Sequence, residues 1–179
     1  MKLIKKLEIQ SKENIINFLN NQAVGRFATI DINGFPQIIP MNFVYVQAEK
    51  IDDSNILKQD AIYMHSYRFG EKIDNIKRNS NTGFEVDQHL AFLPSYYFHP
   101  SDASQADTLY KSVVIKGQSY IIEDKEEKTL ALNSLMEKYQ PEGNYEKLNS
   151  NMHSVQEVTV IKLIPNNMKG KYKIGQQWT

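Results

Sequence analysis

The sequence predicts a mainly β fold: a closed or half-closed barrel of about six antiparallel strands with two or three helices on its periphery. Short apolar runs with a period of two recur along the chain, as expected for strands with one buried face. Asn33-Gly34 marks a tight hairpin between the first two of these runs, because a two-residue turn needs positive φ angles. No crossover helix separates the first strands, which disfavours a parallel α/β sheet.

The composition fits one globular domain over residues 1–179, because 41% of the residues are hydrophobic and 23% are charged. Lys plus Arg equals Asp plus Glu at 21 each, which argues against a nucleic-acid binder and against a polybasic membrane anchor. The absence of cysteine excludes disulfides, zinc–thiolate sites, iron–sulfur clusters and thiol nucleophiles. No signal peptide is visible and no apolar run approaches the roughly 20 residues of a membrane span. We therefore expect a soluble, cytoplasmic protein.

The first third of the chain reads as a helix followed by a hairpin. Ser11 to Asn21 has an N-capping serine at its start and an apolar face, which predicts a short amphipathic helix. Ala23 to Ile32 and Phe35 to Val46 are the two strands of the hairpin. The polar stretch Gln47 to Gln59 predicts a loop.

The stretch from Ile62 to Arg78 begins as a strand and ends as a helix. Its first residues alternate in polarity, Gly70 breaks the pattern, and Ile73 and Ile76 then fall on one stripe of a short helix. A strand that leads into a helix N-terminus presents free N–H groups and the positive end of a dipole, which suits phosphate.

The side chains at this junction fit the same anion. Ser66 offers a hydroxyl donor and Lys72 a positive charge, while His65 and Arg68 lie nearby in the sequence. The alternative is that Arg68 and Lys72 are solvated surface charges.

The middle of the chain predicts two further strands and, between them, a partly extended segment. Thr82 to Val86 is one, and Gln88 to Asp107, with an aromatic cluster broken by prolines, is read as a partly extended strand followed by a loop. Tyr110 to Glu123 is a long strand, and Gly117 within it predicts a bulge or a bend at a barrel corner.

The last third predicts a helix and a final strand. Asp124 and Glu127 form a capping-box-like start for a helix that runs to about Tyr139, with a core-facing apolar stripe. Val155 to Ile164 is the last predicted strand, and a polar tail follows it.

Pro40 interrupts the second strand of the hairpin. Proline cannot donate to a sheet ladder, so this strand lies at an edge, is bulged, or faces something other than a strand. A flat, hydrogen-bonding ligand could lie against Pro40, Met41, Asn42 and Phe43 and use the spare backbone groups. The alternative is an ordinary edge strand.

The histidines do not encode a metal site. They stand at positions 65, 89, 99 and 153, and no two have the short spacing of a ligand pair, so we expect no metal. His65 is the natural proton donor if the junction is catalytic, and a structural residue otherwise. Ser112 lacks a hydrolase nucleophile elbow, and no Walker A loop or Gly-x-Gly-x-x-Gly fingerprint is present.

Seven segments together resemble a known family, the pyridoxamine-phosphate-oxidase-like flavoproteins with the FMN-binding split barrel. The most similar branch is that of the predicted flavin-nucleotide-binding proteins, which includes the nitroimidazole-resistance reductases. The segments occur in order over about Ala23 to Gly143: Val24 to Thr29, Pro40 to Tyr45, Ile62 to Ser66, Gly70 to Lys72, Asn75 to Asn79, Phe84 to Asp87 and Tyr110 to Gly117.

The resemblance implies a six-stranded split barrel that forms a homodimer with FMN at the subunit interface. It assigns the ribityl phosphate to His65, Ser66 and Lys72, and the isoalloxazine to the strand from Pro40 to Phe43. Ser112 and Val113 would complete the pocket from the partner subunit, and His65 matches the active-site histidine of the nitroimidazole reductases.

Two departures argue against vitamin B6 oxidase activity. The Arg-Lys pair of the true oxidases is here Glu71-Lys72, and their C-terminal substrate-binding arginine pattern is missing from Met168 to Lys173.

The function expected from the sequence is an FMN-dependent oxidoreductase. A reduced nicotinamide, NADH or NADPH, would reduce the flavin, and a nitro compound, a quinone or another flavin would accept the electrons. The alternatives are a non-catalytic flavin- or haem-binding protein, in which His153 is the haem-ligand candidate, and a dimeric scaffold with an empty pocket.

Overall fold

The computed structural model describes residues 7–48 and 59–174, in which eight strands form one antiparallel sheet. The strand order is β3-β2-β6-β7-β8-β5-β4, with β1 paired to β8. The chain passes directly from β3 (Pro36–Met41) to β4 (Val44–Val46), which are the two ends of this order, so the sheet curls into a split barrel. The predicted class is therefore confirmed, although the described residues hold eight strands where six were predicted.

The first elements agree with their sequence signals. Helix α1 (Lys12–Asn20) begins after Ser11, whose hydroxyl accepts a hydrogen bond from the Asn14 N–H at 3.3 Å. Strand β2 (Gly25–Ile30) then pairs with β3 along its whole length. The predicted loop from Gln47 to Gln59 lies mostly outside the described residues.

The turn between β2 and β3 differs from the predicted two-residue turn. The Asp31 N–H donates to the Phe35 carbonyl at 2.8 Å, which leaves three residues in the loop. Only Gly34 has a positive φ, at 87°, and the Asp31 carboxylate accepts from the backbone N–H groups of Asn33 and Phe35. The aspartate side chain thus stabilises a wider turn than Asn33-Gly34 alone predicts.

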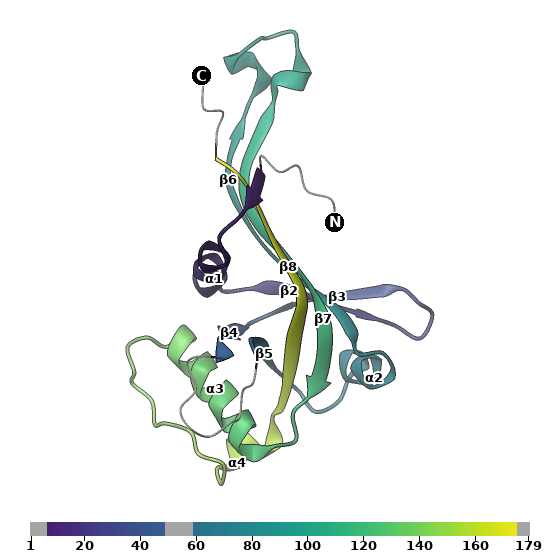
Figure 1. Cartoon of the computed structure of the whole chain (residues 1–179), viewed down its shortest axis with the longest axis vertical. Coiled ribbons are helices and arrows are strands. Elements are labelled where there is room, and N and C mark those ends of the chain that lie inside the picture. The colour runs from purple at the N-terminus through teal and green to yellow at the C-terminus, as the bar shows by residue number, and fades with distance from the viewer. Residues whose placement is uncertain (1–6, 49–58, 175–179) are drawn as a thin grey trace.

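The second third of the chain holds the predicted strand-to-helix junction and a long arm. Strand β5 (Ala61–Ser66) leads into α2 (Glu71–Arg78), with Ile73 and Ile76 buried as predicted. Strands β6 (Asn81–Leu93) and β7 (Asp107–Ile121) pair over almost their entire length. Their far ends, with the short 3₁₀ turns η3 (Ser95–Tyr97) and η4 (Ala103–Gln105), project from the body of the molecule as an arm (Figure 1).

Gly117 is the predicted irregularity in β7. The register with β8 shifts between Lys116 and Gly117, and a Cβ atom at Gly117 would lie 2.1 Å from the Ile164 carbonyl oxygen. The backbone of β8 approaches β7 so closely here that only glycine fits, and the long strand bends at this point.

The end of the chain departs most from the prediction. Helix α3 (Lys125–Tyr139) begins at the predicted Asp124 cap. Residues 153–157 form the short helix α4 (His153–Glu157), and the last strand, β8, runs over Thr159–Lys173. The predicted strand Val155 to Ile164 was therefore wrong in both bounds, and part of the supposed polar tail is a strand paired with β7 and with β1 (Glu8–Ile9).

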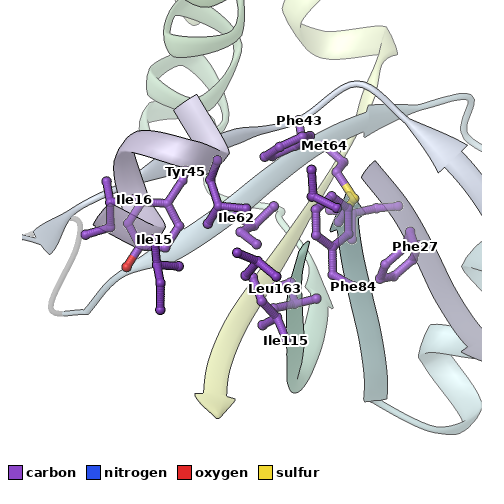
Figure 2. Packing of buried hydrophobic residues seen from close by; sticks show 14 of the residues in the cluster. Ile15, Ile16, Phe27, Phe43, Tyr45, Ile62, Met64, Phe84, Ile115 and Leu163 are labelled. Atoms are coloured by element: carbon purple, nitrogen blue, oxygen red, sulfur yellow. The ribbon is translucent and has the colours of Figure 1, made fainter. Parts of the chain in front are cut away.

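Two apolar clusters form the core. The larger fills the barrel, where Phe27, Phe43, Met64 and Phe84 lie among aliphatic side chains and α1 covers one end (Figure 2). The smaller lies between the outer face of β5 and helices α3 and α4, and its buried members are Val44, Ala61, Tyr63, Ile122, Ala131, Leu132, Leu135, Val155 and Val160. Alternate residues of β5 serve the two clusters, which fixes the faces to which the candidate site residues point.

Candidate functional site

The junction between β5 and α2 brings two of the predicted phosphate ligands together. The Lys72 ammonium donates to the Ser66 hydroxyl at 2.9 Å, and Ser66 is buried while Lys72 is half-buried. Gly70, at φ 129°, precedes α2 without a side-chain cap on the first turn. The free backbone N–H groups of this helix start, the lysine ammonium and the serine hydroxyl are hydrogen-bond donors that suit an anion.

A polar network around the buried Asn75 holds α2 in place, and no local pattern in the sequence predicted it. The Asn75 amide is 1% exposed and donates to the Thr29 hydroxyl of β2 at 3.0 Å. The Arg78 guanidinium donates to the Asn75 amide oxygen at 2.6 Å and to the Ile30 carbonyl at 2.9 Å. The partners of Asn75 are far away in the sequence, so only the fold reveals them.

Two other charged side chains of the junction, Arg68 and Glu71, do not contact the Ser66–Lys72 pair but bond to other elements. Arg68 donates to the Glu157 carboxylate of α4 at 2.7 Å, and both side chains are about half exposed. The carboxylate of Glu71 accepts a hydrogen bond from the Gln37 amide of β3. Arg68 is thus a surface charge, as the alternative interpretation of the sequence proposed for it. Lys72 is the cation that lies beside Ser66.

Pro40 lies on an edge strand, one of the placements that its missing N–H allowed. It stands opposite Arg26 in the register of β3 with β2, and β3 has no second neighbour among the described strands. Pro40 and Asn42 are exposed and Met41 is half-buried, so this segment is open to a ligand. The Asn42 amide donates to the Ala23 carbonyl at 3.2 Å.

Phe43 is less accessible than the sequence indicated. Its ring is fully buried, 4.9 Å from the Phe84 ring in an edge-to-face contact (Figure 2). Its backbone N–H donates to the Tyr139 hydroxyl at 2.8 Å. That hydroxyl donates to the Ala23 carbonyl at 2.6 Å, with the Phe43 carbonyl at 3.0 Å as a second acceptor. A side chain of α3 therefore satisfies backbone groups that we expected to be free for a ligand.

Lys138 lies on the other side of this contact. Its ammonium is 3.7 Å from the centroid of the Phe43 ring and donates to the Leu19 carbonyl near the end of α1 at 3.2 Å. No carboxylate pairs with it among the residues that the structure describes. Burial lowers the pKa of Lys138 to about 8.

His65 and Ser66 lie on opposite faces of β5, because successive residues of a strand alternate. Ser66 shares its face with Ile62 and Met64, whereas His65 shares its face with Tyr63 and lines a cavity beneath α3. This cavity has a volume of about 530 Å³ and also includes Asn42. The structure therefore separates His65 from the Ser66–Lys72 pair and places it with the exposed Asn42.

The two candidates in β7 lie within the sheet. Val113 is fully buried in the barrel core. Ser112 is half-buried and stands between Asp87 of β6 and Lys171 of β8 in the strand register. Within this chain, Ser112 remains open to a ligand and Val113 acts as a core residue.

The described residues contain neither a membrane-spanning helix nor a cluster of metal ligands. Among them, no helix is long and apolar enough to cross a membrane. Over the same ranges, His, Asp and Glu side chains form no group of three or more that could hold a metal ion.

Comparisons with known proteins identify the family to which this split barrel belongs. The sequence profile of the pyridoxamine 5'-phosphate oxidase family matches residues 11–172, so the chain belongs to this family. A search of curated proteins finds no match.

Solved structures share the fold over most of the chain. A candidate 5-nitroimidazole antibiotic resistance protein from Bacteroides thetaiotaomicron is 25% identical with a TM-score of 0.72, and the match covers 92% of this chain and 86% of that one. The flavocytochrome Anf3 from Azotobacter vinelandii is 17% identical with a TM-score of 0.75, covering 98% and 73%. An FAD- and haem-binding protein from Mycobacterium smegmatis is 14% identical with a TM-score of 0.73, covering 94% and 74%.

Proposed function

We propose that this protein binds FMN and is an oxidoreductase that passes electrons from a reduced nicotinamide to a small acceptor. The observation that carries the proposal is the Ser66–Lys72 pair at the uncapped start of α2, which offers a phosphate one positive charge, one hydroxyl and the free N–H groups of a helix. Membership of the pyridoxamine 5'-phosphate oxidase family and the flavoproteins among its structural relatives support a flavin cofactor.

The remaining contacts fit a flat ring beside this phosphate. Pro40, Met41 and Asn42 form an open edge that no second strand covers among the described residues. Bound FMN would supply the electron chemistry, and the chain would hold and orient it. Ser66 and Lys72 would bind the phosphate, while Asn42 and His65 would face the acceptor side.

The proposed substrate is not pyridoxamine phosphate. Glu71 stands where the oxidases have an arginine, and its carboxylate bonds to Gln37 beside the proposed phosphate site. The segment from Met168 to Lys173 forms the end of strand β8, where it pairs with β7, and it contains no arginine that could bind a substrate. We expect no oxidation of pyridoxamine phosphate by the FMN-loaded protein.

We propose a homodimer with the flavin at the subunit interface. Thirteen large hydrophobic side chains are exposed among the described residues, and contiguous exposed apolar patches mark interaction surfaces. They gather on the arm, on the β2–β3 hairpin and in the loop before α2, next to the proposed phosphate site, and include Leu90, Phe92, Tyr96, Tyr97, Ile32, Phe35, Ile38, Tyr67 and Phe69. A second copy covering these faces would enclose the ring, with Ser112 contributed across the interface.

The test is the spectrum and the turnover of the purified protein. We expect it to carry FMN or to quench the fluorescence of added FMN, and then to oxidise a reduced nicotinamide when menadione or a nitro compound is present. A protein that binds no flavin would refute the proposal, and flavin binding without turnover would leave the non-catalytic binding role. Haem at His153 is disfavoured, because this histidine is the exposed first residue of α4.

A further inference from the structure

The cavity beneath α3 is distinct from the Ser66–Lys72 corner. Its floor is apolar and belongs to the smaller core cluster, where Leu132 is 9% and Leu135 is 6% exposed. Its walls are the half-buried side chains of Met136, Leu148 and Val158. The second core cluster is thus incomplete at this point and leaves room for a ligand of two or more rings.

Exposed polar groups line the open side of the cavity. His65, Asn42, Gln140 and Ser154 are all exposed and all belong to its lining. Among the described residues that line it there is no lysine, arginine, aspartate or glutamate. A phosphorylated ligand such as a nicotinamide dinucleotide or a second flavin nucleotide would find no counter-charge here, so the occupant is an uncharged molecule.

Asn42 connects the cavity to the proposed flavin edge. It follows Met41 at the end of β3, and its side chain is part of the cavity lining. A ligand in the cavity would therefore lie next to the segment proposed to carry the ring. This adjacency is what electron transfer between a cofactor and its acceptor requires.

We propose that this cavity binds an uncharged, planar, bicyclic quinone as the electron acceptor, with the apolar rings on Leu132 and Leu135 and a carbonyl oxygen at His65. The inference rests on the proposed function for the role of the ligand and on the cavity for its binding. Reduction of a quinone to a quinol takes two electrons and two protons. Bound FMN would supply two electrons and one proton, taken from the reduced nicotinamide as a hydride, and His65 would relay the second proton from solvent.

The experiment measures menadione binding to the full chain by calorimetry, separately from FMN binding. Met136→Trp fills the cavity and is expected to weaken menadione binding about tenfold or more, whereas Met136→Leu retains it. Both variants should bind FMN as the parent does. Should Met136→Trp fail to fold, Leu148→Trp fills the same cavity from its other wall.

Two matched comparisons test the chemistry of the site. His65→Ala should weaken menadione binding about threefold to tenfold, while His89→Ala on the exposed arm should not change it. A sulfonated naphthoquinone of the same ring size should bind much more weakly than menadione, because its charge would meet no cation in the cavity.

Several results would overturn the inference: no saturable menadione binding, equal binding by Met136→Trp, equal binding of the sulfonated analogue, or haem binding at His65 in place of the quinone. The proposed function fails independently of this. Binding of menadione without binding of FMN would support the cavity site and refute the flavoprotein proposal. Binding of FMN without binding of menadione would support the flavoprotein proposal and refute the cavity site.

Discussion

The hydroxyl of Tyr139 accepts a hydrogen bond from the backbone N–H of Phe43 at 2.8 Å. These residues are 96 positions apart in the chain, and their contact lies where β3 ends and β4 begins. In a continuous sheet a neighbouring strand would accept a hydrogen bond from this N–H. The barrel is split here, so the side chain of a helix residue accepts it instead. The C-terminal turn of α3 therefore holds the segment that carries the proposed flavin edge.

Tyr139→Phe removes this hydroxyl and leaves the Phe43 N–H and the Ala23 carbonyl without it. We expect a loss of about 1–3 kcal/mol in the free energy of unfolding, because a partly buried donor loses its partner. Urea unfolding measures this loss. Tyr120→Phe is the matched control, since its exposed hydroxyl bonds only to Gln118 two residues away, and equal losses in both variants would contradict the assignment.

Lys138 gives the protein a predictable pH dependence. Burial lowers its pKa in the folded state to about 8, below the value of about 10.4 for an exposed lysine. Between these values the unfolded chain binds more protons than the folded one, so the contribution of Lys138 to stability rises with pH through this window. Below pH 8 both states are protonated, and the burial penalty is fully present.

Unfolding of the parent and of Lys138→Met at pH 7 and at pH 9.5 measures this effect. The stability of the parent relative to the variant should increase at the higher pH, because the unfolded chain binds more protons than the folded one in this range. Lys147→Met, in the exposed loop after α3, controls for the loss of one positive charge. A relative stability that stays constant or falls would contradict the burial of an unpaired ammonium at this position.

A largely enclosed, half-buried ion pair anchors α3 to the sheet. The Lys162 ammonium of β8 donates to the Glu127 carboxylate, and the Tyr63 hydroxyl donates to the same oxygen at 2.6 Å. Each charged side chain is 13% exposed. Lys162→Met leaves the carboxylate unpaired, and we expect a loss of about 3–5 kcal/mol in the free energy of unfolding.

Arg68→Ala is the comparison for this pair, because the exposed Arg68–Glu157 bridge should contribute about 0–1 kcal/mol. Thermal or urea unfolding distinguishes the two. If the two variants lost similar amounts, the Glu127 carboxylate would be better solvated than its burial indicates.

Gly117→Ala tests the bend in β7. The added Cβ would meet the backbone of Ile164 at 2.1 Å, so the strands must separate, and we expect a loss of about 1–3 kcal/mol. Gly83→Ala in β6 is the matched control, because its nearest neighbour would be the Ala28 methyl at 3.6 Å. Urea unfolding of the two variants should differ clearly, and a tolerated alanine at 117 would show that the strands are less tightly apposed.

Local signals in the sequence predicted much of the fold. The caps at Ser11 and Asp124, the break at Gly70 and the irregularity at Gly117 each depend on a few neighbouring residues, and the structure has all of them. An edge position was one of the three placements that the missing N–H of Pro40 allowed, and the structure has it.

The full length of the arm and the C-terminal half of β8 were missed because ladder hydrogen bonds stabilise them more than burial does. Polar residues such as Asn166, Asn167 and Lys169 carry no period-two apolar signal, yet β8 pairs with β7 along this stretch. Tyr139 and Asn75 were missed for a different reason: their partners are far away in the sequence, and nothing in the local pattern marks either residue as a polar anchor.

The central claim is that Ser66 and Lys72 hold the phosphate of a flavin, and the direct measurement compares FMN with riboflavin, which lacks that phosphate. We expect the parent protein to bind FMN much more tightly than riboflavin, and Lys72→Ala to reduce that preference about tenfold to a hundredfold, because a charge-assisted contact is lost. Lys77→Ala, on the exposed side of the same helix, should keep the preference. A parent protein that binds both flavins equally, or a Lys72→Ala variant with an unchanged preference, would contradict the account.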